Sequence, residues 1–180
     1  MTTEQLLAMP DDGVERWLIR GQLREKPKTY RDRWSSRVLA RVAHFLEDWR
    51  EQQPHPRGSV LGGNAGVRLR RDPDTMLSID AVYISAEAAA ANPDDAAVID
   101  GVPALAVEIL SPNDTVEEIH EKIDEYLTAG VLLVWIIDPR RRTVMLYRPG
   151  QEPEFVNARQ ELSGEPELPG FRVRVADLFA

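Results

Sequence analysis

The chain has 180 residues, of which 43% are hydrophobic and 29% are charged, and it contains no cysteine. This length predicts one domain covering residues 1–180, and the composition excludes a disordered or collagen-like chain. The lack of cysteine excludes disulfides and cysteine zinc sites, and it agrees with a cytoplasmic location. No apolar stretch approaches the roughly 20 residues of a membrane span and no signal peptide is evident, so we expect neither secretion nor membrane insertion.

The net charge of −8 argues, taken alone, against tight binding to nucleic acid, because phosphates are held largely by Lys and Arg. The charge is unevenly distributed. Residues 1–71 carry 14 Lys and Arg against 9 Asp and Glu, whereas residues 72–180 carry 8 against 21. The basic N-terminal part could bind a polyanion, or basic and acidic elements could face each other in the fold. From charge alone the second interpretation is favoured.

The first long element is a helix expected from Arg31 to Gln52, after a short amphipathic element at Val14–Leu23. Apolar residues recur along one face of the helix at helical spacing: Trp34, Val38, Val42, Phe45, Leu46 and Trp49. A row at four-residue steps flanks that face: Arg33, Arg37 and Arg41. Such a row is typical of a solvated helix edge, although it could also bind phosphates.

Strand patterns follow the helix. Residues 59–61 and 66–70 predict two strand-like pieces, and a further strand is expected from about Leu77 to Ile84. The alanine-rich segment 85–101 predicts a helical or irregular excursion on the surface. Residues 103–110 then form an apolar run that is typical of a strand covered on both faces.

A second helix is expected to begin with the capping-box pattern at Thr115–Glu118 and to stop at Gly130. Strands are expected at 131–137, at 143–147 and at 171–175. The order helix, three strands, helix, strand predicts an α/β (α+β) fold, in which helices flank one mixed sheet of about five or six strands. We expect the first long helix on one face of this sheet, with the second helix packed beside it.

Glu108 is the most informative residue, because it interrupts the apolar run and an ionised carboxylate is costly to bury without a partner. Asp80 follows Ile79 in the preceding strand pattern, so two neighbouring strands could present carboxylates to one point. Close carboxylates repel each other unless a proton or a metal lies between them, and oxygen ligands favour Mg²⁺, Mn²⁺ or Ca²⁺. The alternative is that both are strand-end acids in solvent or paired with Arg. That alternative is the stronger one for Asp80 alone and the weaker one for Glu108.

Lys122 lies at the border of the apolar face of the second helix, between Glu118 and Tyr126. Spacing alone favours an ordinary Glu118–Lys122 pair four residues apart. A lysine on the inner edge of that helix could instead point back over the sheet toward a metal-bound water. Glu15, considered by itself, is typical of a surface acid.

These positions lie in segments that resemble the Uma-two family of endonucleases. The resemblance is carried by Val14–Leu23, by Ile79–Ile84, and by the stretch from Val107 through Ser111-Pro112 to Lys122, Tyr126, Gly130 and Trp135–Pro139. The closing segments 168–171 and 178–179 extend it over nearly the whole chain. The family is similar to the restriction-endonuclease-like PD-(D/E)XK superfamily, whose core has the order αβββαβ.

The resemblance implies a metal site in which Asp80, Glu108 and the Ile109 carbonyl are ligands and Glu15 is an accessory acid. It implies Mg²⁺, with Mn²⁺ as the alternative, and DNA as the partner. Two positions depart from the superfamily pattern: Ile79 stands where a proline is usual, and Leu110 stands where the lysine is usual. The resemblance assigns the role of that lysine to Lys122.

The expected activity is therefore metal-dependent hydrolysis of DNA phosphodiester bonds, with Asp80, Glu108, Lys122 and Glu15 as site residues. Arg33, Arg37 and Arg41 are the candidates for holding the DNA backbone. A homodimer is expected, because cleaving two strands is easier with two related basic faces. The alternative is a catalytically inactive domain of the same fold that binds nucleic acid or protein.

Overall fold

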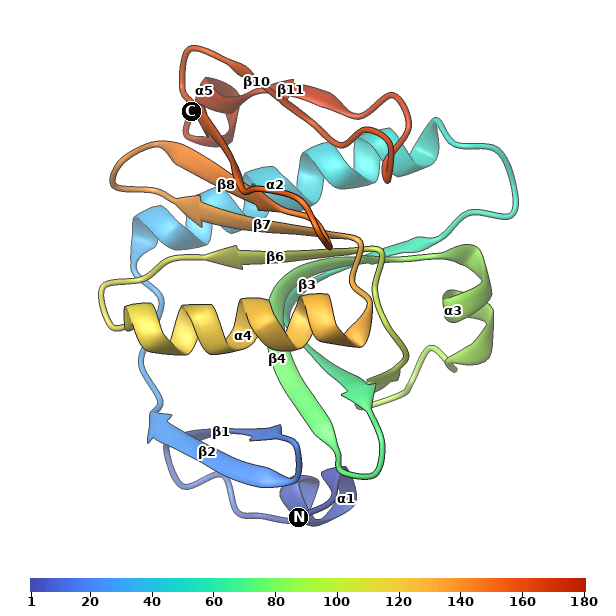
Figure 1. Ribbon diagram of the computed structural model, residues 1–180, viewed down its shortest axis with the longest axis vertical. Helices are drawn as coiled ribbons and strands as arrows, with labels where there is room; N and C mark the ends of the chain where they lie inside the picture. Colours follow the sequence, from blue (N-terminus) through green and yellow to red (C-terminus); the bar gives the residue numbers. More distant parts are fainter.

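The computed structural model describes all residues, 1–180, and its main feature is one large mixed sheet (Figure 1). Seven strands follow the order β2-β1-β4-β6-β7-β8-β9, while β3 pairs with β4 and β5 pairs with β3. The pairs β6–β7 and β3–β5 are parallel and the others are antiparallel. The sheet has nine strands, so the expected five or six was too low. The N-terminal hairpin and the short strands β5 and β9 account for most of the difference.

The sheet strands are β1 (Val14–Ile19), β2 (Gln22–Pro27), β3 (Ser59–Arg70), β4 (Thr75–Ile84), β5 (Ile99–Asp100), β6 (Leu105–Ile109), β7 (Leu133–Asp138), β8 (Thr143–Tyr147) and β9 (Glu154–Asn157). A separate two-stranded sheet consists of β10 (Glu161–Ser163) and β11 (Arg172–Arg174). The helices are α1 (Thr3–Leu7), α2 (Arg33–Glu51), α3 (Ala86–Ala91), α4 (Val116–Ala129) and α5 (Val175–Leu178). None of them combines the length and the apolar character needed to cross a bilayer.

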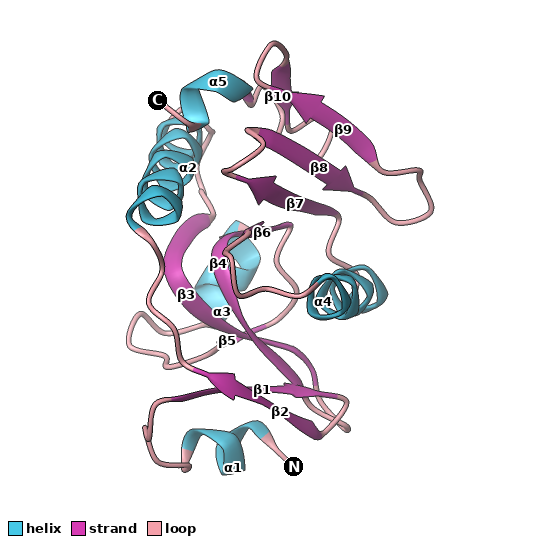
Figure 2. Ribbon diagram, turned by 90° about the vertical axis from the view of Figure 1, so that its left-hand side faces the viewer, coloured by secondary structure: helices cyan, strands magenta, loops and turns pink.

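The elements α2, β3, β4, β6, α4 and β7 reproduce the expected αβββαβ order, with α3 and β5 inserted before β6. Helices α2 and α4 lie on opposite faces of the sheet (Figure 2), so the expectation that they pack beside each other was wrong. Side chains of a strand alternate between faces. Val107 accordingly packs in the cluster that contains Val38 of α2, whereas Ala106 packs with Ile123 of α4. Glu108, two residues after Ala106, faces the α4 side.

Local sequence explains where both long helices begin. Thr115 and Glu118 form the expected capping box, and Gly130 ends α4 with φ 101°, a left-handed conformation that glycine adopts at little cost. In α2 the carboxylate of Asp32 accepts a hydrogen bond from the backbone N–H of Ser35 at 2.7 Å. The helix therefore begins at Arg33 rather than at Arg31, which leaves Arg31 outside the helix.

The amphipathic segment near the start of the chain is strand β1 and the turn that leads into β2. The hairpin turns at Arg20 and Gly21, whose φ angles of 50° and 73° lie in the left-handed region. β2 is an edge strand without a buried residue. Ion pairs hold it against α4 and the loop before that helix, because Arg24 pairs with Glu121 at 2.7 Å and Lys26 pairs with Asp114 at 3.3 Å.

Two other expected strands differ in detail. The pieces 59–61 and 66–70 belong to one strand, β3, whose pairing with β4 is irregular between Gly62 and Ala65. The last expected strand, 171–175, corresponds to β11, but β11 pairs with β10 outside the main sheet. Both differences reflect tertiary pairing, which local patterns do not specify.

The N-terminal helix α1 is attached through Asp74, whose carboxylate accepts hydrogen bonds from the backbone N–H and the hydroxyl of Thr3, both at 2.7 Å. Burial alone would raise the pKa of Asp74, but the hydrogen bonds from Thr3 outweigh it and the pKa lies below its ordinary value of 3.8. A carboxyl group whose pKa is lower in the folded state than in the unfolded state stabilises the fold at pH values above its unfolded-state pKa. This stabilisation disappears as the pH falls through the folded-state pKa.

Asp74→Asn is therefore expected to lower the free energy of unfolding by about 1–3 kcal/mol near neutral pH and by less in acid. Urea unfolding of wild type and variant near neutral pH and near pH ~3 measures both differences. Asp72→Asn changes a neighbouring exposed carboxylate and is the control. A loss that is the same at both pH values would contradict the role assigned to the charge of Asp74.

Candidate active site

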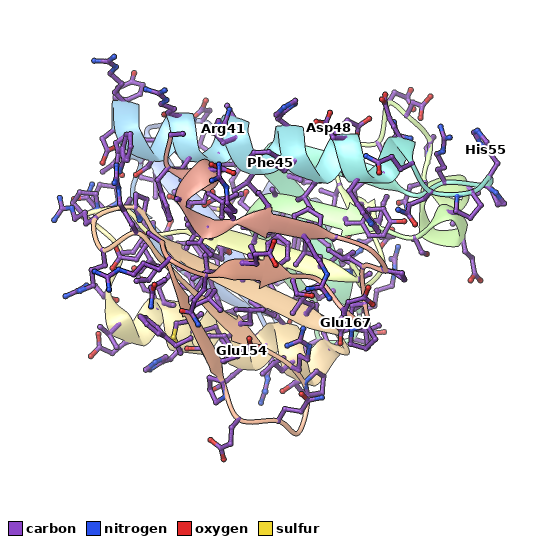
Figure 3. The ribbon with its side chains drawn as sticks, turned by 90° about the horizontal axis from the view of Figure 1, so that it is seen from above. Arg41, Phe45, Asp48, His55, Glu154 and Glu167 are labelled. Carbon is purple, nitrogen blue, oxygen red and sulfur yellow. The ribbon has the colours of Figure 1, made fainter.

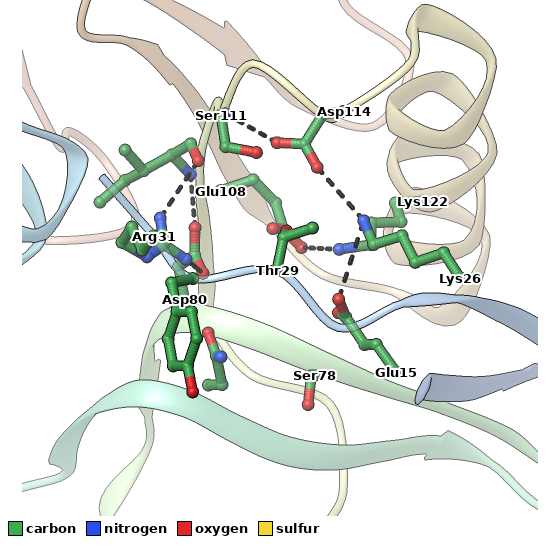
Figure 4. Close-up of a pocket in the computed structure, with 13 residues that line it drawn as sticks. Glu15, Lys26, Thr29, Arg31, Ser78, Asp80, Glu108, Ser111, Asp114 and Lys122 are labelled. Atoms are coloured by element: carbon green, nitrogen blue, oxygen red, sulfur yellow. Dashed lines mark hydrogen bonds and ion pairs between the residues drawn. The ribbon is translucent and has the colours of Figure 1, made fainter. Parts of the chain in front are cut away.

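A small polar pocket opens where β4, β6, the start of α4 and the β1–β2 hairpin meet (Figure 4). We call it the acidic pocket; its volume is about 110 Å³. Only two of its 13 lining residues are hydrophobic. The charged ones are Glu15, Lys26, Arg31, Asp80, Glu108, Asp114 and Lys122. The four expected acids and bases, Glu15, Asp80, Glu108 and Lys122, thus line one pocket together with Ile109.

Asp80 and Glu108 come from adjacent strands, as the sequence predicted. β4 and β6 are antiparallel with Ala81 opposite Val107, which places the two acids at neighbouring positions. One oxygen of Asp80, Oδ2, accepts a hydrogen bond from the backbone N–H of Ile109 at 2.7 Å. Each of the two acids is only 5% exposed. Two carboxylates this deeply buried need a cation or hydrogen-bond donors.

The donors to Glu108 come from the inner face of α4. Lys122 Nζ lies 3.1 Å from Glu108 Oε1, and the Tyr126 hydroxyl also donates to Oε1. Lys122 therefore points over the sheet and is not paired with Glu118. The second oxygen of Glu108, Oε2, receives no hydrogen bond and is not sealed from solvent. It is available to a ligand in the acidic pocket.

Burial raises the pKa of Glu108; the charge of Asp80 acts in the same direction, and Lys122 opposes both. For Lys122 burial alone lowers the pKa, but the attraction of Glu108, Asp80 and Glu15 outweighs it and the pKa is raised. Lys122 is therefore a cation at neutral pH. Burial and the nearby charge of Glu108 raise the pKa of Tyr126, so its hydroxyl stays protonated and donates.

Glu15 occupies the hairpin side of the acidic pocket. It lies opposite Lys26 in the β1–β2 register, and Lys26 Nζ is 3.9 Å from the Glu15 carboxylate. The same ammonium is 3.3 Å from Asp114. Glu15 makes no hydrogen bond to Asp80 or Glu108, so it stands at the edge of the carboxylate pair. The sequence alone indicated no role for Lys26 or for Asp114.

Arg31 is the site residue that the sequence did not indicate. Its guanidinium donates to Asp80 Oδ1 through Nη2 and to the Ile109 carbonyl oxygen through Nη1, the latter at 3.3 Å. Figure 4 shows the side chain of Arg31 beside that of Asp80. A positive charge thus contacts two of the three expected metal ligands. The spacing Arg31-Asp32-Arg33 carries no local signal for a contact with a strand 49 residues further along the chain.

The donor set fits a hard divalent cation. No group of three or more acidic or histidine side chains is arranged to hold a metal ion, so a metal in this pocket would be held by two carboxylates, the Ile109 carbonyl and water. Mg²⁺ commonly keeps several waters and takes one or two carboxylates. The guanidinium of Arg31 independently marks this position as one that attracts a cation. The oxygens of Asp80, Glu108 and Ile109 thus fit the ligand preference of Mg²⁺ or Mn²⁺.

The expected row of basic residues on α2 is divided in the structure. Arg33 and Arg37 are exposed on the first turns of α2, beside Trp34 and outside the acidic pocket. Arg41 donates through Nε to the carbonyl of Asp177 at 3.0 Å, and its guanidinium lies 4.9 Å from the centre of the Phe45 ring (Figure 3). Arg41 thus contacts protein groups, whereas Arg33 and Arg37 face solvent.

An αβββαβ core that presents two buried carboxylates and a lysine in one pocket defines a restriction-endonuclease-like protein. The chain belongs to the Uma2 family, described as "Putative restriction endonuclease", which matches residues 3–176. A solved structure from Anabaena variabilis, titled a "putative nuclease belonging to DUF820", has a TM-score of 0.81 and 20% identity. That match covers 99% of this chain and 97% of the other. No curated protein matches significantly. Family and fold are thus those of nucleases.

Proposed function

We propose that the acidic pocket is the active site of a Mg²⁺-dependent endonuclease that hydrolyses phosphodiester bonds in DNA. The observation that carries this proposal is the meeting of Asp80 and Glu108, both buried, with the ammonium of Lys122. The pKa values of Glu108 and Lys122 are both raised, and ionisable groups whose pKa values are shifted by burial and by charged neighbours in one pocket are typical of catalytic sites. The Uma2 family membership supports the same chemistry.

In this proposal Asp80, Glu108 and the carbonyl of Ile109 hold the ion, which is Mg²⁺ or, alternatively, Mn²⁺. When bound, such an ion makes a coordinated water more acidic and neutralises charge on a phosphate. Lys122 supplies a positive charge beside Glu108, where it orients the attacking water or stabilises the phosphate in the transition state. Glu15, at the edge of the pocket, is an accessory acid.

The position of Lys122 supports its proposed role, because its ammonium reaches the carboxylate of Glu108 from helix α4. The superfamily pattern has its lysine two residues after the glutamate, where this chain has Leu110. Lys122 instead follows Glu108 by 14 residues and still lies 3.1 Å from its carboxylate. An ammonium beside the carboxylate pair is thus retained, although it comes from another element.

One observation favours a second function, that of a catalytically inactive domain that binds nucleic acid or protein. The guanidinium of Arg31 already balances the charge of Asp80 and contacts the Ile109 carbonyl. A site neutralised by its own arginine needs no metal in order to be stable. This alternative predicts DNA binding or protein binding without any response to Mg²⁺.

A plasmid-nicking assay separates the two functions. The wild type is expected to nick supercoiled DNA with Mg²⁺ or Mn²⁺ and to lose the activity with EDTA. Lys122→Met should reduce nicking by about 100-fold or more, because it removes a charge that acts on the reacting groups. A matched RNA substrate shows whether DNA is preferred. Wild-type protein that nicks neither DNA nor RNA with either ion would favour the inactive domain.

Two further expectations remain proposals. The homodimer is supported by the need to hold or cut both strands of a duplex, and sedimentation at micromolar concentration distinguishes a dimer from a monomer. A cytoplasmic location is supported by the lack of cysteine.

A further inference from the structure

We propose that five arginines beside the acidic pocket form a cradle for the phosphate backbone of duplex DNA. They come from two elements: Arg33 and Arg37 from the start of α2, and Arg140, Arg141 and Arg142 from the turn between β7 and β8. We call this group the arginine patch. The proposal rests on the proposed nuclease function and assigns the surface that carries the DNA flanking the cleaved bond.

Specific contacts join the two elements into one surface. The indole N–H of Trp34 on α2 donates to the carbonyl oxygen of Pro139 at 3.1 Å. The guanidinium of Arg142 lies 5.9 Å from the centre of the Trp34 ring. Arg140 is also near the start of α2: the backbone N–H of Ser35 lowers the pKa of Asp32, and the charge of Arg140 lowers it further.

The arginine patch holds unbalanced positive charge in a chain whose net charge is −8. All five arginines are exposed, and only Arg141 forms an ion pair, 3.0 Å from Asp138. Backbone N–H groups donate hydrogen bonds to the two nearby acids, Asp32 and Asp138. Asp138 accepts from the N–H groups of Arg140 and Arg141, and Asp32 accepts from that of Ser35. Four guanidiniums are thus left to face solvent, and guanidinium matches the geometry of a phosphate.

The arginine patch adjoins the acidic pocket. Arg31 lines the pocket, and Arg33 follows it by two residues. The hydroxyl of Ser35 lies 3.5 Å from the carbonyl of Leu110, and the N–H of Leu110 donates to the carbonyl of Ile137 just before the β7–β8 turn. A backbone with one phosphate at the acidic pocket would therefore place neighbouring phosphates along the arginine patch. Phosphate contacts of this kind fix position without reading sequence.

DNA binding of the intact protein tests the proposal, measured by fluorescence anisotropy with a short labelled duplex in EDTA, so that no cleavage occurs. The double variant Arg37→Ala/Arg140→Ala removes two patch charges. The control, Arg57→Ala/Arg172→Ala, removes the same charge near the other end of α2. Arg57 lies near the C-terminal end of α2 because it donates to the Gln53 carbonyl. Arg172 lies near the same end because its neighbour Phe171 packs against Trp49. Urea unfolding confirms that both variants are folded.

The patch variant is expected to bind the duplex about tenfold more weakly than the wild type. The slope of log affinity against log salt concentration should fall by about two, one for each lost phosphate contact. The control variant should retain the wild-type slope. An equal loss of affinity in both variants would show that only the net charge matters, and this would overturn the proposal. An unchanged affinity of the patch variant, or a wild type that does not bind the duplex, would also overturn it. Mg²⁺-dependent nicking by the wild type is scored separately, so the nuclease proposal can survive any of these results.

Discussion

Replacing Glu108 by glutamine is expected to abolish Mg²⁺ binding in the acidic pocket and to reduce nicking by at least about 100-fold. Removing a residue that only hydrogen-bonds to a metal ligand typically costs roughly 10- to 100-fold in metal affinity or activity. Removing one of the only two carboxylate ligands should therefore cost more. The amide keeps the shape of the side chain and an oxygen that can still accept from Lys122 and Tyr126. Calorimetric Mg²⁺ titration and plasmid nicking measure the two effects.

Glu108→Gln should also lower stability. In the metal-free protein the buried carboxylate of Glu108 is the ion partner of the half-buried Lys122, so its neutralisation leaves an unpaired cation, at a cost of about 3 kcal/mol. Urea unfolding measures this loss and shows whether the variant remains folded during the activity assay. Glu117→Gln makes the same chemical change at an exposed position on α4 and should behave as wild type. Unchanged Mg²⁺ affinity in folded Glu108→Gln would remove Glu108 from the metal site.

Replacing Arg31 by glutamine is expected to act in two opposite directions. Without metal, the buried carboxylate of Asp80 loses its ion partner, and the free energy of unfolding should fall by about 3 kcal/mol. In contrast, Mg²⁺ should bind at least about tenfold more tightly, because the guanidinium no longer competes for Asp80 and the Ile109 carbonyl. Thermal unfolding with and without Mg²⁺, together with calorimetric titration, measures both changes.

Arg172→Gln provides the control, since Arg172 is exposed on β11 and forms no ion pair. It should alter neither the melting temperature nor the Mg²⁺ affinity. If Arg31→Gln binds Mg²⁺ no more tightly than the wild type does, the guanidinium does not occupy the position of the metal. Wild type and variant that both fail to bind Mg²⁺ would instead favour the inactive domain.

The sequence predicted the elements whose signals are local. The capping box at Thr115 and the glycine at position 130 fix both ends of α4 through their own backbone hydrogen bonds. Strand β6 was recognised because four of its five residues are apolar, as is typical of a strand covered on both faces, and all five are buried in the structure. Glu108 stands out against that background, and a carboxylate there implies a partner. The pairing of Asp80 and Glu108 then follows from the adjacency of β4 and β6.

The rest of the site could not be predicted, because it depends on side chains that meet across long separations in the chain. Arg31 reaches Asp80 over 49 residues, and Lys26 reaches Asp114 over 88. Both cations lie in a charged segment that is equally typical of a solvated surface. The opposite placement of α2 and α4 depends on which faces of β6 each helix covers, and strand patterns that are apolar on both faces do not encode that choice.

The edge strand β2 has a consequence for how copies of this protein can associate. An unpaired strand edge invites a second chain to extend the sheet, and charged side chains or proline oppose this. β2 carries Arg24 and Lys26 and ends at Pro27, and both cations are tied back to acids of α4 or the loop before it. This edge is therefore a poor template for edge-to-edge association with a second copy of the chain, and the two ion pairs leave Lys26 lining the acidic pocket.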